Sequence, residues 1–226
     1  MSQLLVSLSQ KIITCRKCPR LVTYREEVAR TKVRRFLQQS YWGKAVPGFG
    51  DDQASLFIIG LAPAAHGANR TGRMFTGDAS GDWLYRALYE TGFANQPQSV
   101  AADDGMTLQD AYISAVVRCA PPGNKPLPSE IENCSTYLQQ ELLLLGKAKI
   151  FLCLGHIAFR QFCRISRLQG LQFGHGLRYP LHKGKWLFCS YHPSRQNTQT
   201  GRLTWEAWIA VFKEVRATLQ KINPNH

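Results

Sequence analysis

The sequence has no long apolar run. No stretch of about 18 or more uncharged apolar residues occurs, so a membrane-spanning helix is not expected. The helix-like stretch at residues 1–14 lacks the charged start and the small-residue cleavage site of a signal peptide. We therefore expect a soluble, intracellular protein that lies in the cytoplasm and has no membrane partner.

Acidic residues are also scarce. The chain has 15 Asp and Glu against 28 Lys and Arg, which gives a net charge of +13. Such a balance is unusual for an enzyme of small neutral metabolites and favours a polyanionic partner, with nucleic acid as the leading candidate. A basic surface without a specific ligand is the alternative. Membrane-surface binding is less favoured, because no basic amphipathic helix with an aromatic face stands out.

Short apolar runs alternate with segments of helical period. With 226 residues and 44% apolar content, the chain can bury a large core, and we expect a single domain over residues 1–226. Asp78 and the pair Ser129 and Glu132 are candidate helix-start signals. The alternation predicts an α/β fold with a parallel sheet between helices. The predicted strands are residues 55–60, 112–117, 149–155 and 186–191, and the predicted helices are residues 79–91, 128–145, 156–163 and 204–221.

Three loops carry most of the unusual sequence. In an open α/β sheet the ligand site lies beyond the carboxyl ends of the strands. The loops at residues 61–78, 118–128 and 192–202 follow the first, second and fourth predicted strands, so we expect them to meet there. The first loop lacks both the G-x-G-x-x-G and the G-x-x-x-x-G-K-[ST] pattern of phosphate-binding loops. The first fifty residues, rich in Arg and Lys, resemble an appended arm.

The seven cysteines fall into two groups. Three lie inside predicted strands or a helix and are expected to be small buried apolar residues: Cys153, Cys163 and Cys189. The other four are Cys15 and Cys18, which form a C-x-x-C pair, and Cys119 and Cys134, which lie beside loops. Four thiolates could hold zinc or an iron-sulfur cluster, and the wide separation of the second pair favours the cluster. It would clamp the arm to the loop after the second strand.

The loop from Gly60 to Asp78, the run His192-Pro193-Ser194 and the four cysteines together resemble the family 5 uracil-DNA glycosylases, which are related to the family 4 iron-sulfur enzymes. The resemblance covers residues 15 to about 203. It implies a four-iron four-sulfur cluster on Cys15, Cys18, Cys119 and Cys134, and a three-layer α/β/α sandwich around a parallel four-stranded sheet.

The resemblance also implies a function in base excision repair. The protein is expected to flip uracil, and other deaminated bases such as hypoxanthine, out of DNA and to hydrolyse the N-glycosidic bond. We expect it to act as a monomer. No lysine stands where a Schiff-base nucleophile is expected, so the predicted product is an abasic site without strand cleavage.

The first motif supplies a stacking residue and a carboxylate. The resemblance makes Phe75 the ring on which the base stacks and places Gly60 in the substrate site. A core position is the alternative for Phe75. Asp78 stands before a helix, where it could position water or oppose the positive charge on the sugar. Plain helix capping is the alternative for Asp78.

The chain departs from the family 4 pattern at two points. Leu61 and Ala62 occupy the place where family 4 has an acidic residue, so that role must lie elsewhere. Ser114 stands where family 4 has a base-reading Asn in the second strand. Asn124 matches an Asn implicated in family 5, and the loss of the strict base reader fits a broader base tolerance.

The last motif supplies a donor and a phosphate contact. His192, as a neutral donor, would bond O2 of uracil as negative charge collects there. Ser194 should bind a phosphate, and Gln196 should fill the space left by the flipped base. His66 is given a possible supporting role, whereas the remaining histidines at positions 156, 175 and 182 are expected to be structural.

Five cations are expected against the DNA backbone, where they would make affinity depend on salt: Arg70, Arg73, Lys125, Arg195 and Arg202. Two rival functions follow from the same features. One is a non-catalytic iron-sulfur protein that binds nucleic acid and senses redox state. The other is a zinc hydrolase, which is disfavoured because four cysteines leave no position for water on the metal.

Overall fold

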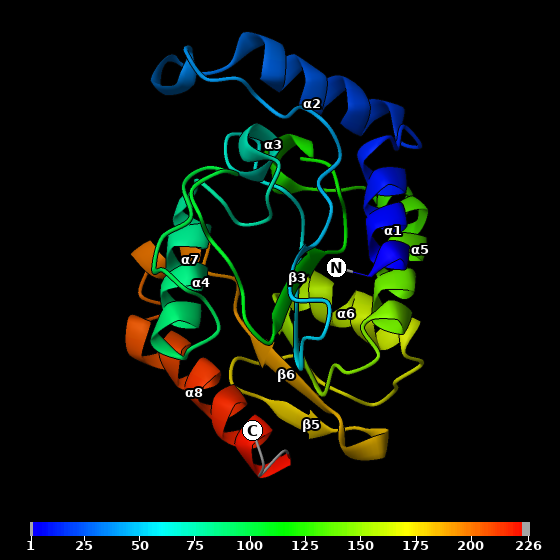
Figure 1. The fold of residues 1–226 in the computed structure, drawn as a ribbon, viewed down its shortest axis with the longest axis vertical. Coiled ribbons are helices and arrows are strands. Elements are labelled where there is room, and N and C mark those ends of the chain that lie inside the picture. Colours follow the sequence, from blue (N-terminus) through cyan, green and yellow to red (C-terminus); the bar gives the residue numbers. More distant parts are fainter. Residues whose placement is uncertain (1, 223–226) are drawn as a thin grey trace.

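Four apolar segments form the parallel centre of a six-stranded sheet in the computed structural model, which describes residues 2–222 (Figure 1). The strand order is β1-β3-β2-β4-β6-β5. The neighbours β3, β2, β4 and β6 pair in parallel, whereas β1 and β5 pair antiparallel at the two edges. The strands are β1 (Phe49–Gly50), β2 (Leu56–Gly60), β3 (Ala111–Ala115), β4 (Ile150–Leu154), β5 (Arg178–Pro180) and β6 (Trp186–Ser190).

The four predicted strands are found within one or two residues of their expected bounds, but the sheet is larger than predicted. It has six strands and is mixed, so the expectation of a parallel four-stranded sheet is corrected. The missed strands are very short, and β5 is partly exposed. They have neither an apolar run nor a clear alternation, which explains why the sequence did not reveal them.

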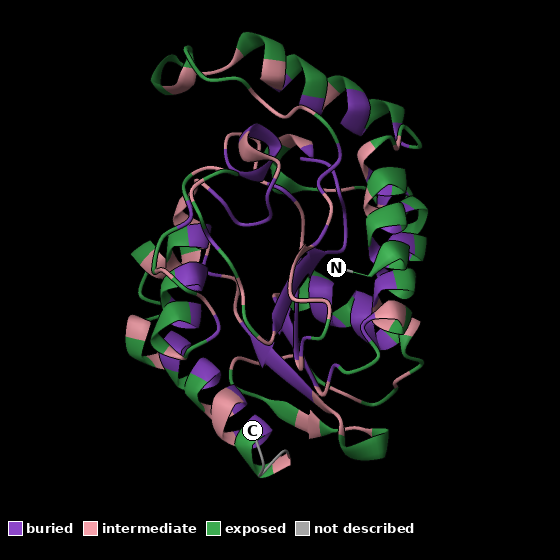
Figure 2. Cartoon of the chain, in the orientation of Figure 1, coloured by how far each residue is buried: buried purple, intermediate pink, exposed green. Residues whose placement is uncertain are grey.

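Side chains of the central strands alternate between two cores. On β2, Phe57 and Ile59 pack into one core and Leu56 and Ile58 into the other. Figure 2 shows the central strands buried along their length and the helices buried on their inner faces. Both faces of the sheet are thus covered, which explains why its strands are continuously apolar.

Helices α1, α5 and α6 pack on one face, and α4 and α8 on the other (Figure 1). Asp78 caps α4 as predicted. The start of α5 differs from the prediction, because Glu130 rather than Glu132 accepts the N–H of Leu127. The helices are α1 (Gln3–Ile13), α2 (Pro19–Thr31), α3 (Ala68–Thr71), α4 (Ala79–Glu90), α5 (Pro128–Leu144), α6 (His156–Ile165), α7 (Arg195–Gln199) and α8 (Trp205–Ile222), with short 3-10 turns η1 (Arg34–Phe36), η2 (Pro122–Asn124) and η3 (His182–Gly184).

The N-terminal arm consists of two helices. The predicted helix-like stretch at residues 1–14 is α1, although Met1 lies outside the described residues. Helix α1 packs on α5, while α2 and η1 run along one end of the molecule next to α3 (Figure 1). Within residues 2–222 no helix combines the length and the apolar character needed to cross a bilayer.

Candidate active site

The three predicted loops meet in one cavity of about 620 Å³ beyond the carboxyl ends of β2, β3 and β6. Parallel strands bring the loops that follow them to the same edge of the sheet, and this produces the cavity. Eight of the predicted site residues line it: Phe75, Asp78, Asn124, Lys125, His192, Ser194, Arg195 and Gln196. Leu61 and Ala62 form part of its wall, so the position that is acidic in family 4 is apolar here.

The ring of Phe75 lies beside the imidazole of His192. The ring centroids are 5.7 Å apart and the planes differ by 28°. Phe75 is 8% exposed and has a left-handed backbone, with φ of 56°. Two glycines make room for it, because a Cβ on Gly60 would lie 2.7 Å from the ring and one on Gly81 would lie 1.7 Å from the carbonyl oxygen of Phe75. The ring therefore lines the cavity and also packs into one of the two cores.

Asp78 both caps α4 and lines the cavity. Its Oδ1 accepts the backbone N–H groups of Ser80 and Gly81, each at 3.0 Å. No described residue donates a hydrogen bond to Oδ2. Burial raises the pKa of Asp78, and the two N–H groups oppose that shift. Helix capping and a role in the cavity are thus compatible, since the two oxygens have different surroundings.

His192 is half-buried at the cavity and neutral at physiological pH. Burial lowers the pKa of its imidazole to about 4. None of the described residues hydrogen-bonds its ring nitrogens, whereas its carbonyl oxygen accepts from Nδ2 of Asn197 at 2.8 Å. Ser194 caps α7 by accepting the N–H of Asn197 at 3.4 Å. The loop is therefore fixed through its backbone, and the ring is left available to a ligand.

Five predicted site residues do not line the cavity: Gly60, Arg70, Arg73, Ser114 and Arg202. The Ser114 hydroxyl donates to Glu141 at 2.6 Å on the other side of β3, where Glu141 also pairs with the buried Arg118. Arg202 lies over the ring of Tyr191, 4.6 Å from its centroid. Gly60 does not line the cavity, but its lack of a side chain leaves room for the ring of Phe75. The structure therefore does not bring Ser114 to a position from which it could read a base.

Arg70 and Arg73 were expected against DNA, and their burial corrects that expectation. The guanidinium of Arg73 pairs with Asp104 at 2.5 Å and donates to Ser99 at 2.7 Å. The guanidinium of Arg70 donates to the carbonyl oxygens of His66 and Gly77. Both side chains stabilise the loop from within.

Three other histidines form contacts outside the cavity. His66 bonds the hydroxyl of Tyr41 at 3.1 Å and is not part of the cavity lining. His175 bonds the backbone at Ala207 and Tyr191, and His156 packs on Phe173. These three support the loops around the site.

Sequence reasoning missed several supporting residues. Ala64, Ser80 and Gly123 line the cavity, and Gly81 allows the close approach of Phe75. The signal was the density of small residues on both sides of Phe75, which is typical of a segment where backbone must approach another group closely.

The four predicted ligand cysteines gather where the arm meets the sheet. Cys15 follows α1, Cys18 caps α2, Cys119 follows β3 and Cys134 lies in α5. Burial raises the pKa of the Cys119 thiol to about 11, and the neighbouring Cys15 and Cys18 raise it further. Burial likewise raises the pKa of Cys134 to about 12, with Cys119 and Cys18 adding to the shift. The four thiols are therefore close enough to influence one another.

Arg25 is buried beside these thiols. It is 2% exposed, and its Nη1 donates to Sγ of Cys119 at 2.9 Å while Nη2 donates to the carbonyl oxygen of Cys15 at 3.1 Å. Its Nε has no partner, and no carboxylate of residues 2–222 forms an ion pair with it. A buried cation is costly unless negative charge lies close to it, so a negatively charged group held by thiolates would be stabilised beside Arg25.

The cysteines do not form a preformed single-ion site within residues 2–222. Among the described residues, no three or more His, Cys, Asp or Glu side chains are close enough together to hold one ion. A tetrahedral zinc site draws its four sulfur atoms together, each at about 2.3 Å from the ion, whereas a four-iron cluster is a larger body with one thiolate on each iron. Four cysteine donors are the ligand set of either group.

The remaining three cysteines, Cys153, Cys163 and Cys189, are buried in the core, as expected. Burial raises the pKa of each thiol. They are therefore protonated and unreactive at neutral pH.

Comparison with known proteins places this site in a family. The sequence model of the uracil DNA glycosylase superfamily matches residues 47–216. A type-5 uracil-DNA glycosylase of Thermus thermophilus is 48% identical over 209 residues, which cover 92% of this chain and 94% of that protein. A type-5 enzyme of Mycobacterium tuberculosis is 49% identical over 213 residues, covering 92% and 80%. A type-4 enzyme of Archaeoglobus fulgidus is 29% identical over 170 residues, covering 71% and 68%.

Proposed function

The chain belongs to the uracil-DNA glycosylase superfamily and, within it, to the type-5 enzymes, and from that premise we propose that it removes uracil from DNA by hydrolysis of the N-glycosidic bond. The observation that carries the proposal is the shared cavity of Phe75, Asp78 and His192. It offers an aromatic surface, a carboxylate and a neutral donor to one flipped nucleotide.

Each group has a role in the departure of the base. Phe75 stacks on the extruded uracil, and the imidazole of His192 donates to O2 as the base takes up negative charge. Because burial lowers the pKa of its imidazole to about 4, His192 donates as a neutral ring. A preorganised donor of this kind typically contributes roughly 3 kcal/mol to transition-state stabilisation.

Asp78 acts on the sugar side of the bond. Its Oδ1 is occupied by the helix N–H groups, so Oδ2 is the oxygen that can orient a water or face the cationic sugar. Leu61 and Ala62 offer no carboxylate in the opposite wall, which leaves Asp78 as the acidic residue in the lining. Asn124, from the second loop, would bond the polar edge of the base or the attacking water.

The base specificity is proposed to be broad. Ser114 is turned to Glu141, so no side chain of β3 reads the base edge as an Asn would. The cavity, with a volume of about 620 Å³, is large enough for a purine such as hypoxanthine as well as for uracil. Substrate contacts at the rim are assigned to Ser194 for a phosphate and to Gln196 for the space that the flipped base leaves.

We further propose a four-iron four-sulfur cluster on Cys15, Cys18, Cys119 and Cys134. When bound, the cluster would crosslink α1, α2, α5 and the loop after β3 without taking part in the reaction. The buried, unpaired charge of Arg25 supports a negatively charged group at this place.

Strand-break analysis tests the function. Duplexes that carry uracil, hypoxanthine or no lesion are incubated with the protein, heated in alkali and resolved by length. Alkali-dependent breaks at the lesion support the proposal, whereas binding without breaks indicates the rival, a non-catalytic nucleic-acid-binding protein. Because Lys125 lines the cavity, borohydride is added in a parallel reaction, and the absence of a covalent DNA adduct is expected for simple hydrolysis.

A further inference from the structure

A strongly basic segment of the arm lies next to the active-site loop. Residues 32–44 contain Lys32, Arg34, Arg35 and Lys44 and no Asp or Glu. Three of these cations have local contacts: Lys32 Nζ donates to a backbone carbonyl, Lys44 lies over the ring of Trp42, and Arg35 lies over the ring of Phe36. Arg34 and Arg35 are exposed, and no carboxylate of the described residues forms an ion pair with either. Their charge is therefore available to a partner.

Arg70 fixes this segment to the loop that carries Phe75 and Asp78. Its guanidinium lies over the ring of Phe36, 4.1 Å from the centroid, and its Nη1 donates to Gln39 at 2.7 Å. Its Nη2 donates to the carbonyl oxygen of Gly77, the residue before Asp78. One buried side chain thus holds the basic segment and the end of the active-site loop together.

Further contacts continue along the segment. The hydroxyl of Tyr41 bonds His66 at 3.1 Å, and the backbone N–H of Trp42 donates to the carbonyl oxygen of Arg70 at 2.8 Å. Arg35 is close enough to α4 to act electrostatically on Asp82, one turn after Asp78. The segment is therefore a fixed neighbour of the active-site loop.

We propose that residues 32–44 form a docking surface for the DNA backbone beside the flipped nucleotide, with Arg34 and Arg35 as its phosphate contacts. The partner is duplex DNA, because the surface carries only positive charge and is continuous with the loop that borders the cavity. In this proposal Arg34 and Arg35 make the phosphate contacts that the sequence led us to expect of Arg70 and Arg73. Arg70 instead holds the segment that carries them in place.

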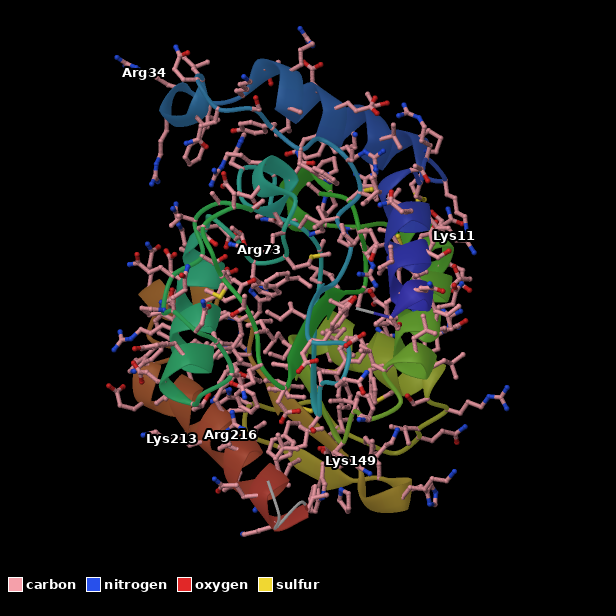
Figure 3. The ribbon with its side chains drawn as sticks, in the orientation of Figure 1. Lys11, Arg34, Arg73, Lys149, Lys213 and Arg216 are labelled. Atoms are coloured by element: carbon pink, nitrogen blue, oxygen red, sulfur yellow. The ribbon has the colours of Figure 1, made fainter. Side chains whose placement is uncertain are left out.

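The proposal rests on the proposed function only in that the substrate is DNA. Contacts to phosphates do not depend on base identity, so binding to an undamaged duplex tests the surface without reference to catalysis. Figure 3 shows Arg34 at the end of the molecule near α2 and α3, and Lys149 and Lys213 at the opposite end. The latter two provide a control that removes the same number of charges far from the site.

The experiment compares R34Q/R35Q with K149Q/K213Q in the full-length protein. Affinity for an undamaged duplex is measured by fluorescence anisotropy from 50 to 200 mM salt. If Arg34 and Arg35 contact two phosphates, the slope of log K against log salt becomes shallower by about 1.8, and the affinity difference from wild type changes about tenfold across this range. The control pair is expected to keep the slope of the wild type.

Two outcomes overturn the proposal. One is a wild-type slope in R34Q/R35Q, and the other is an equal change in both variants, which would indicate only the loss of net charge. The wild-type protein is assayed on the uracil duplex in parallel. If the wild type fails to cut the uracil duplex but the slope of R34Q/R35Q is shallower, the docking surface is supported and the glycosylase function is not. The two failures are therefore distinguishable.

Discussion

The carboxylate of Asp78 lies directly against the Cα of Gly67: a Cβ at residue 67 would come within 2.1 Å of Oδ2 and 2.9 Å of Cγ. The side chain of Asp78 is short and caps α4, so it cannot move aside without losing its hydrogen bonds to the N–H groups of Ser80 and Gly81. The position of the one oxygen that is available to a ligand therefore depends on the absence of a side chain at residue 67.

Gly67→Ala is expected to slow base excision by about tenfold to a hundredfold, since a displacement of about 1 Å in a reacting group has effects of that size. Single-turnover release of uracil measures it. Gly146→Ala is the control, because its Cβ would meet its nearest atom only at 4.0 Å. Equal rates in the two variants would show that Asp78 tolerates displacement.

The raised pKa of Asp78 predicts a pH dependence. The active form is the ionised carboxylate, so the rate falls as the pH drops through the pKa of Asp78. Because burial raises that pKa, the decline begins at a higher pH than an exposed Asp would give, while His192 stays neutral until about pH 4. Single-turnover rates from pH 4 to 8 measure the decline. The same decline in Asp78→Asn would assign it to another group.

Arg73 is expected to stabilise the fold. Arg73→Gln leaves the part-buried Asp104 without its ion-pair partner, which costs up to about 3–5 kcal/mol of unfolding free energy and lowers the melting temperature by up to about 10 °C. Arg86→Gln removes an exposed pair with Glu90 and is expected to cost about 1 kcal/mol or less. Differential scanning calorimetry compares them, and similar melting temperatures would mean that the buried pair is not stabilising.

Arg25 is expected to help retain the proposed cluster. Arg25→Gln removes the donor to Cys119 and the buried positive charge, so iron and the visible iron-thiolate absorbance should be lost faster during dialysis against a chelator. Arg30→Gln on the same helix is the control, since Arg30 forms only an exposed pair with Glu27. Equal retention of iron in both variants would separate Arg25 from the cysteine site. A colourless, zinc-rich wild-type protein would contradict the cluster itself.

Much of the site could be predicted from the sequence. The central strands are continuously apolar because both faces of the sheet are covered, and parallel strands bring their following loops to one edge. These two features predict the position of the cavity from the sequence alone. The motif at His192 and the loop ending at Asp78 then identify the groups that line it. The single-domain organisation and the monomeric state stay predictions.

The direction of polar side chains could not be predicted in the same way. Arg70 and Arg73 stand in a basic, glycine-rich loop, and the sequence does not distinguish a cation that faces solvent from one that bonds internal carbonyl groups. Ser114 alternates with apolar residues on a strand, but its turn toward Glu141 depends on a helix that begins 14 residues later. Such contacts are set by tertiary packing, which local patterns do not encode.

The most direct test of the account is single-turnover excision of uracil from a duplex by wild-type protein, Asp78→Asn and His192→Ala, with Arg86→Gln as the surface control. We expect alkali-dependent breaks at uracil with the wild type and the control, and a rate at least about tenfold lower in each of the other two variants. Wild-type rates in both Asp78→Asn and His192→Ala would contradict it.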